Sequence, residues 1–124
     1  MPKKIEKKYS ISDELKERAY RFALAILELA SMLPDTEEGR VIKRQLCKSG
    51  TSVGSNLEEA DGSLTLNDFV YKIDIAFKEA KETRYWLRII IDRKLLKKEI
   101  VIHHREEALE LIKILSTIIY KCLK

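Results

Sequence analysis

The chain has 124 residues, of which 45% are hydrophobic and 35% are charged, a composition that suits one globular domain. Only four Gly and two Pro are present, which argues against an all-β fold rich in turns. The net charge is +4, and residues 63–124 carry the whole excess, with 13 basic and nine acidic side chains. This excess allows binding to nucleic acid but does not require it.

The first twelve residues are expected to form a flexible basic arm that precedes the folded domain. This arm contains four lysines: Lys3, Lys4, Lys7 and Lys8. It lacks the apolar segment of a secretory leader, and no apolar run in the chain is long enough to span a membrane. We therefore expect a soluble, cytoplasmic protein that does not contact membranes.

The first helix is predicted to begin after Ser12, whose side chain can cap it, and to end before Pro34. Its apolar residues recur every three or four positions. The second helix is predicted to begin after Thr36 and to run to about Ala60. Its centre, residues 49–56, is rich in Ser, Gly, Thr and Asn, which are poor helix formers. A break into two shorter helices around Gly50 and Gly54 is therefore an alternative.

The third helix is predicted to start after Thr65, because Asp61 and Gly62 are typical of a helix end. It would continue to about Ile91, and a basic connector would follow. The fourth helix would span roughly residues 99–122, with an apolar face wider than one core contact needs. Four helices of similar length with short connections predict an all-α fold, an antiparallel up-down-up-down four-helix bundle formed by residues 13–124.

Polar residues follow one side of the second helix and one side of the third, and we call them the polar seam. They are Gln45, Ser49, Ser52, Asn56, Glu59, Lys72, Glu79 and Glu82. A hairpin that turns near Ser63 would place Glu59 opposite Asp68 and Ser49 opposite Glu79. We interpret the polar seam as a structural hydrogen-bonded network rather than as a ligand site.

Basic side chains gather at the end of the third helix and in the connector. They are Arg84, Arg88, Arg93, Lys94, Lys97 and Lys98. One hypothesis is a phosphate-binding patch. The alternative is a solvated helix end, where cations are favourable near the helix dipole. Nearby aromatic residues, Phe77, Tyr85 and Trp86, are interpreted as core or interface anchors rather than as groups that stack on bases.

Metal binding and catalysis find little support in the sequence. Glu99, His103 and Glu107 have helical spacing that could form half of a metal site, but no second histidine-bearing helix exists. Cys47 and Cys122 lack metal-ligand spacing, and we expect them to be reduced core residues rather than a disulfide. No phosphate loop or nucleophile motif occurs. We therefore expect neither an enzyme nor a metal or other cofactor.

The polar seam and the motifs around it resemble the four-helix-bundle family of proteins encoded in intervening sequences of bacterial large-subunit rRNA genes. The resemblance covers roughly Leu15 to Leu123. Its centre is Gln45-Leu46, Ser49, Thr51-Ser52-Val53-Gly54, Asn56, Glu59-Ala60, Asp68-Phe69, Lys72-Ile73, Lys78-Glu79-Ala80, Glu82-Thr83 and Tyr85-Trp86-Leu87. The chain is similar to the branch with Glu-Ala and Glu-Thr-x-Tyr-Trp-Leu motifs, whereas many members have Asn-Ile-Ala-Glu-Gly at residues 56–60.

This resemblance implies a continuous second helix and a ring-shaped homo-oligomer, with pentamers typical. It also implies a distant similarity to the accessory variability protein of diversity-generating retroelements, a basic pentamer that binds nucleic acid and a reverse transcriptase. We therefore expect a non-enzymatic, pentameric bundle that binds RNA or DNA non-specifically through its basic surface. The alternative is a scaffold that binds a protein partner and has no role with nucleic acid.

Overall fold

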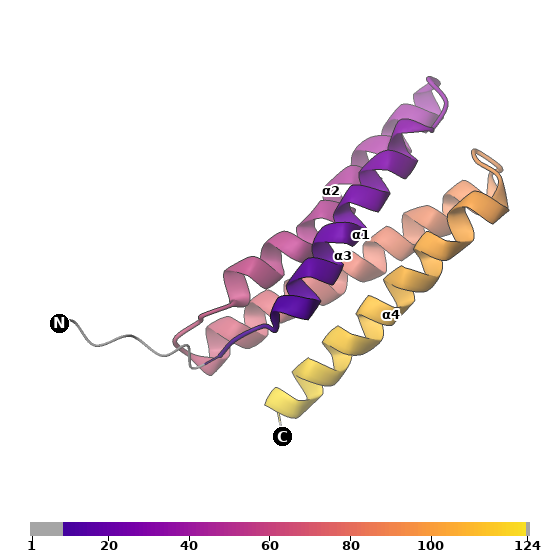
Figure 1. Cartoon of the computed structure of the whole chain (residues 1–124). Coiled ribbons are helices and arrows are strands. Elements are labelled where there is room, and N and C mark those ends of the chain that lie inside the picture. Colours follow the sequence, from indigo (N-terminus) through magenta and orange to yellow (C-terminus); the bar gives the residue numbers. More distant parts are fainter. Residues whose placement is uncertain (1–8, 124) are drawn as a thin grey trace.

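The structure, a computed structural model, describes residues 9–123 and contains four helices in that range (Figure 1). They are α1 (Asp13–Ser31), α2 (Glu37–Ala60), α3 (Leu66–Asp92) and α4 (Lys98–Cys122). Each helix packs on the next one along the chain, and α4 touches α1 only slightly. The predicted all-α, antiparallel four-helix bundle is confirmed. None of the described helices is long and apolar enough to cross a membrane.

Local capping chemistry sets where the helices begin. The hydroxyls of Ser12, Thr36 and Thr65 each accept a hydrogen bond from the backbone N–H three residues further on. The cap before α4 is Lys97, whose side chain makes no such bond. Gly62 has a φ of 83°, the left-handed conformation that the sequence predicted for the connection after α2. Short polar signals therefore determine three of the four helix starts.

Residues 9–12, which were assigned to a flexible arm, pack on the bundle. Tyr9 bridges to Ser63 and lies 5.7 Å from the ring of Phe69, measured between centroids. Ile11 is 5% exposed, and its N–H donates to Asp61 Oδ1 over 2.9 Å. These contacts hold the entry to α1 against the α2–α3 connection. The prediction of a flexible arm otherwise concerns residues 1–8, which lie outside the described residues.

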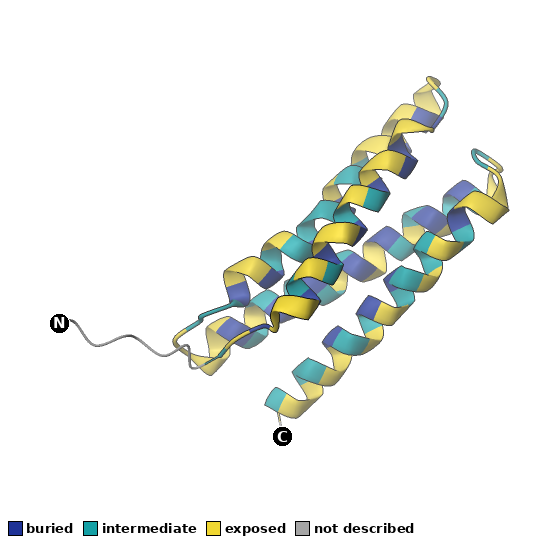
Figure 2. Cartoon of the chain, in the orientation of Figure 1, coloured by how far each residue is buried: buried dark blue, intermediate teal, exposed yellow. Residues whose placement is uncertain are grey.

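The core lies on the faces that the helices turn toward one another (Figure 2). Its largest fully buried side chains come from all four helices, and burying each stabilises the fold by about 1.5–3 kcal/mol. They include Ile26, Leu46, Leu57, Ile73, Leu87 and Leu111. On α4, only Val101, Ala108, Leu111 and Leu115 are buried. The rest of the wide apolar face of α4 is partly or fully exposed, because α1 covers little of it.

The small residues at the centre of α2 bring its backbone close to α1. A Cβ atom added at Gly50 would lie 2.6 Å from Cγ2 of Ile26, which is itself fully buried. Poor helix propensity in this segment costs roughly 4–6 kcal/mol relative to polyalanine, and only tertiary packing can offset such a cost. The helix runs without interruption from Glu37 to Ala60, so the alternative of a break near Gly50 and Gly54 is wrong.

Replacing Gly50 with Ala should lower the free energy of unfolding by about 1–3 kcal/mol, because the added methyl group overpacks against Ile26. Chemical denaturation monitored by circular dichroism measures the change. Gly54→Ala is the matched control. Its Cβ would meet Ala19 at an ordinary 3.5 Å, so higher helix propensity should leave stability unchanged or raise it by up to about 1 kcal/mol. Equal effects of the two substitutions would contradict the close contact at Gly50.

Candidate nucleic-acid interface

A basic groove of about 350 Å³ lies between α3 and α4. It is lined by Lys81, Arg84, Tyr85, Arg88, Arg105, Leu109 and Ile112, and this set is called the basic groove below. The lining contains four cations from two helices and no carboxylate from the described part of the chain. Such a surface attracts polyanions, because its lining carries four positive charges and no negative one.

Helical periodicity places these side chains together. On α3, Lys81, Arg84 and Arg88 recur at three and four positions, so they share one side of the helix. Leu87 and Ile90 are fully buried and hold the opposite side of α3 in the core. The antiparallel α3–α4 hairpin then brings the first half of α4, with Arg105, alongside the second half of α3.

The cations of the basic groove keep much of their capacity for anions. Within residues 9–123, Arg88 forms an ion pair only with Asp92, at 3.7 Å, and both side chains are about two-thirds exposed. Nε of Arg84 is buried and has no hydrogen-bond acceptor among residues 9–123. An unsatisfied buried donor is unfavourable, and Arg84 contributes its positive charge to the basic groove rather than an accessible Nε donor.

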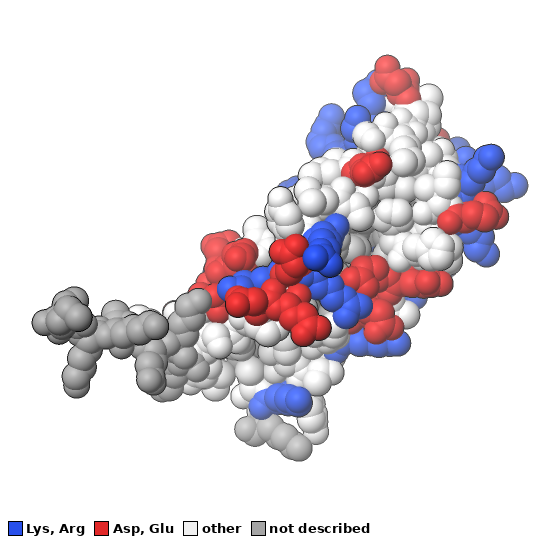
Figure 3. Space-filling view, in the orientation of Figure 1, with Lys and Arg blue, Asp and Glu red and all other residues white. Residues whose placement is uncertain are grey.

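The structure separates the six predicted basic residues into two groups. Arg84 and Arg88 belong to the basic groove. The other four form a tip cluster at the α3–α4 connection: Arg93, Lys94, Lys97 and Lys98. Figure 3 shows basic side chains gathered at this end of the molecule, with acidic side chains beside them. The single basic patch predicted from the sequence is thus divided between the basic groove and the tip cluster.

Arg93 in the tip cluster already has a partner. Its guanidinium donates to both carboxylate oxygens of Glu38, over 2.7 and 3.3 Å. This hydrogen-bonded pair raises the pKa of Arg93 and lowers the pKa of Glu38. The pair joins the α3–α4 connection to the first turn of α2. The charge of Arg93 is therefore partly neutralised by Glu38, while Lys94, Lys97 and Lys98 remain exposed.

Two cations of the basic groove, Lys81 and Arg105, were missed in the sequence. Lys81 precedes Arg84 and Arg88 at helical spacing, so the same periodicity that selected those two could have found it. To predict Arg105 as part of the groove, one must know the register of the α3–α4 hairpin, and the sequence does not reveal that register. Tyr85 is 56% exposed and lines the basic groove, so it is not a core residue.

The polar seam is only partly buried, and its predicted pairing is wrong by about one helical turn. Lys72 pairs with Glu59 at 3.1 Å, instead of Asp68 facing Glu59. Thr83 Oγ1 donates to Ser49 Oγ over 2.8 Å, whereas the sequence predicted that Glu79 would lie opposite Ser49. The chain runs past the end of α2 before α3 begins, so the first turn of α3 lies beyond the last turn of α2 (Figure 1). This offset shifts the residues of α3 that face α2 relative to the predicted pairing.

Other members of the polar seam lie nearer the surface. Gln45, Ser52 and Asn56 are half-buried, and Glu59 and Glu82 are exposed. The Ser52 hydroxyl and the Asn56 amide donate to backbone carbonyls one turn earlier in α2 instead of crossing to α3. Two contacts of the polar seam therefore cross from α2 to α3: the buried Ser49–Thr83 hydrogen bond and the Glu59–Lys72 ion pair at the surface.

Glu79 occupies an unfavourable position for a carboxylate. Its Oε2 atom is buried and has no hydrogen-bond partner in the described range. Burial raises the pKa of Glu79, and the neighbouring Glu82 raises it further, while Lys48 opposes the shift. The deprotonated form is therefore less favourable in the folded chain than in the unfolded chain.

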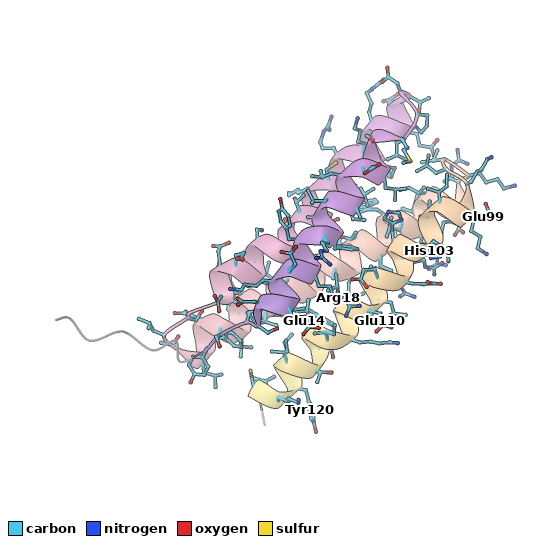
Figure 4. The ribbon with its side chains drawn as sticks, viewed as in Figure 1. Glu14, Arg18, Glu99, His103, Glu110 and Tyr120 are labelled. Carbon is cyan, nitrogen blue, oxygen red and sulfur yellow. The ribbon has the colours of Figure 1, made fainter. Side chains whose placement is uncertain are left out.

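A cavity of about 610 Å³ lies between α1 and α4 and contains the histidines. Figure 4 shows Arg18 on α1 and His103 on α4, two of the residues that line this cavity. Arg18 donates to both carboxylate oxygens of Glu107, over 2.7 and 2.8 Å, so Glu107 is engaged in an ion pair. Among residues 9–123, no three His, Cys, Asp or Glu side chains form a group that could hold a metal ion. Both cysteines are free thiols.

The fold and the basic groove describe an all-α bundle with one cationic face. The family model of the 23S rRNA-intervening sequence protein matches residues 12–117, and the chain belongs to this family. The resemblance noted in the sequence is thereby confirmed at the level of the family. Its branch motifs and its similarity to the retroelement protein stay predictions.

A solved structure is also similar. It is the crystal structure of a protein with unknown function from the S23 ribosomal protein family of Bacteroides thetaiotaomicron. The two share 34% sequence identity with a TM-score of 0.79, and the match covers 85% of this chain and 97% of the other. No curated protein matches the chain. The comparisons thus define the family and the fold.

The buried hydroxyl pair gives a double-mutant test of the α2–α3 contact. Ser49→Ala and Thr83→Val should each lower the free energy of unfolding by about 1 kcal/mol, because each removes the bond between the two hydroxyls and one bond from a hydroxyl to its own helix backbone. The double variant should lose less than the sum, since both substitutions remove the same bond. Denaturation in urea measures all four proteins. Strictly additive losses would show that the two hydroxyls do not interact.

Glu79→Gln should raise the melting temperature at pH 7 and have little effect near pH 4. The raised pKa means that folded Glu79 binds protons more tightly than unfolded Glu79. Its contribution to stability is therefore fully present below about 4.5, the ordinary value, and is lost as pH rises through the folded pKa. Melting curves between pH 4 and 7 test this. Glu58→Gln, at an exposed position of α2, is the control and should show no such divergence.

Proposed function

We propose that this chain is a cytoplasmic, non-enzymatic subunit of a ring-shaped homo-oligomer, with five subunits as its expected size, that binds RNA or DNA. The basic groove would contact phosphates without reading base sequence, and the tip cluster would add to the attraction. The supporting observation is the basic groove itself, with four cations and no carboxylate among its described lining residues. No step of this proposal requires a metal, a cofactor or a reaction.

Exposed apolar side chains support the assembly part of the proposal. On α1, Tyr20, Leu24 and Leu27 are 57%, 50% and 42% exposed and follow one another at helical spacing. Tyr120 in the last turn of α4 and Leu123 just after the helix are 64% and 72% exposed. Apolar surface of this kind is stabilised when a neighbouring subunit covers it. A ring would also repeat the basic groove around its axis and strengthen the field that attracts nucleic acid.

The second candidate function is a scaffold for a protein partner. A groove of about 720 Å³ between α1 and α2 favours it, because Tyr20, Leu24 and Leu27 line that groove beside Gly54. A helix with an apolar face could dock there. Recovery of one defined protein from nuclease-treated lysate, lost on Leu24→Asp, would support the scaffold over the nucleic-acid proposal.

Light scattering, with and without a mixed RNA and DNA pool at low salt, tests the proposal directly. We expect a pentamer that shifts to a heavier complex, and the shift should disappear as salt is raised, because phosphate contacts release counterions. The variant with Gln at Lys81, Arg84, Arg88 and Arg105 should keep the oligomer mass and lose the shift. Each lost phosphate contact should reduce the slope of log affinity against log salt by about 0.7–0.9.

The control replaces Lys94, Lys97 and Lys98 of the tip cluster with Gln and leaves the Arg93–Glu38 pair intact. It removes three charges outside the basic groove, so affinity should fall much less than in the groove variant. Equal losses in the two variants would show that binding follows net charge and not the groove. A monomer in solution would contradict the ring, and an oligomer that ignores nucleic acid would favour the scaffold.

A further inference from the structure

Tyr85 gives the basic groove a feature that phosphate binding alone does not need. The side chain is 56% exposed, although it lies between the cations of α3 and beside the apolar residues of α4. Its ring meets Trp86 edge to face, with centroids 5.1 Å apart and planes at 72°. Trp86 in turn packs against the core. This contact restrains the Tyr85 ring and leaves it accessible to a ligand.

The remaining lining of the basic groove is apolar. Leu109 and Ile112 contribute hydrocarbon surface from α4, next to the tyrosine ring. A double helix presents ridges of phosphate to a protein surface and keeps the faces of its bases stacked inside. A single strand, in contrast, offers unpaired bases whose flat faces stack on aromatic side chains while its phosphates contact cations. An exposed aromatic ring, apolar walls and four cations therefore match a single strand.

We propose that the basic groove takes single-stranded RNA or DNA, with one unpaired base stacked on Tyr85 and the adjacent phosphates held by Lys81, Arg84, Arg88 and Arg105. The inference rests on the proposed binding of nucleic acid and specifies its form. RNA and DNA share the chemistry on which it relies, namely a phosphate chain with free base faces. Arg84 directly precedes Tyr85 in α3 and lines the basic groove, so it is the cation placed to bind a phosphate beside the stacked base.

The test uses fluorescence anisotropy with labelled oligonucleotides of about 12 nucleotides, a length within the site sizes of single-strand-binding proteins. The probes are oligo(dT), oligo(rU) and a DNA duplex of the same length, all at one salt concentration. The full-length chain should bind each single strand at least about tenfold more tightly than the duplex. The RNA and DNA arms show which polymer it binds more tightly.

Tyr85→Leu should weaken single-strand binding by about tenfold, a loss in the range measured for one stacked base. It should leave duplex binding and the salt slope unchanged, because the number of phosphate contacts stays the same. Tyr85→Phe should retain single-strand affinity, since the aromatic face remains. Tyr71→Leu is the matched control, because Tyr71 lies on α3, is 63% exposed and does not line the basic groove.

Several results would overturn the inference. Equal or tighter binding to the duplex would do so, as would unchanged single-strand affinity in Tyr85→Leu. In both cases the phosphate-binding proposal would survive, because the protein still binds nucleic acid. A Tyr85→Leu variant with altered oligomer mass would instead identify Tyr85 as a subunit contact. If the unmodified chain binds none of the three probes, the proposed function itself is wrong.

Discussion

The centre of α2 lies close to both neighbouring helices because its residues are small. Gly50 lets α1 approach until Ile26 fills the space of the missing side chain, and Ser49 forms a buried hydrogen bond with Thr83 on α3. The first contact sets the spacing of α1 and α2, and the second joins α2 to α3. Thr83 marks the side of α3 that faces α2, while Lys81, Arg84 and Arg88 line the groove toward α4. The basic groove is therefore formed by a different side of α3 from the side that contacts α2.

Different sides of α3 contact different parts of the molecule. One side carries Ile73, Ala80 and Leu87 into the core, and a second faces α2 with Thr83 and Glu79. A third side faces α4 and contributes cations to the basic groove. None of the α3 carboxylates lines the basic groove: Asp74 pairs with Lys78, Asp92 pairs with Arg88 at 3.7 Å, and Glu79 has a buried oxygen without a partner in the described chain. A chain with a modest net charge of +4 can thus present a strongly cationic surface locally.

Ion pairs between distant parts of the chain distribute the remaining charge. Arg18 and Glu107 join α1 to α4 across their opening, and Arg93 and Glu38 join the α3–α4 connection to α2. Both pairs are partly exposed, so they serve orientation more than stability. The pair with Glu38 also makes Arg93 less available to bind an anion. The match to a solved structure at 34% identity indicates that this bundle geometry is shared with a relative of unknown function.

The sequence by itself determined the class of fold, most of the helix boundaries and the family. These properties depend on local signals: apolar periodicity, capping hydroxyls at Ser12, Thr36 and Thr65, and a glycine suited to positive φ. Residue propensities left the continuity of α2 open, whereas the family resemblance implied it. Only the tertiary structure decided that Ser49 contacts Thr83, that Arg105 lies in the same groove as Arg84, and that Arg93 pairs with Glu38. These outcomes depend on interhelical register and close backbone approach. Both arise from packing between residues far apart in the chain, which helical periodicity does not encode.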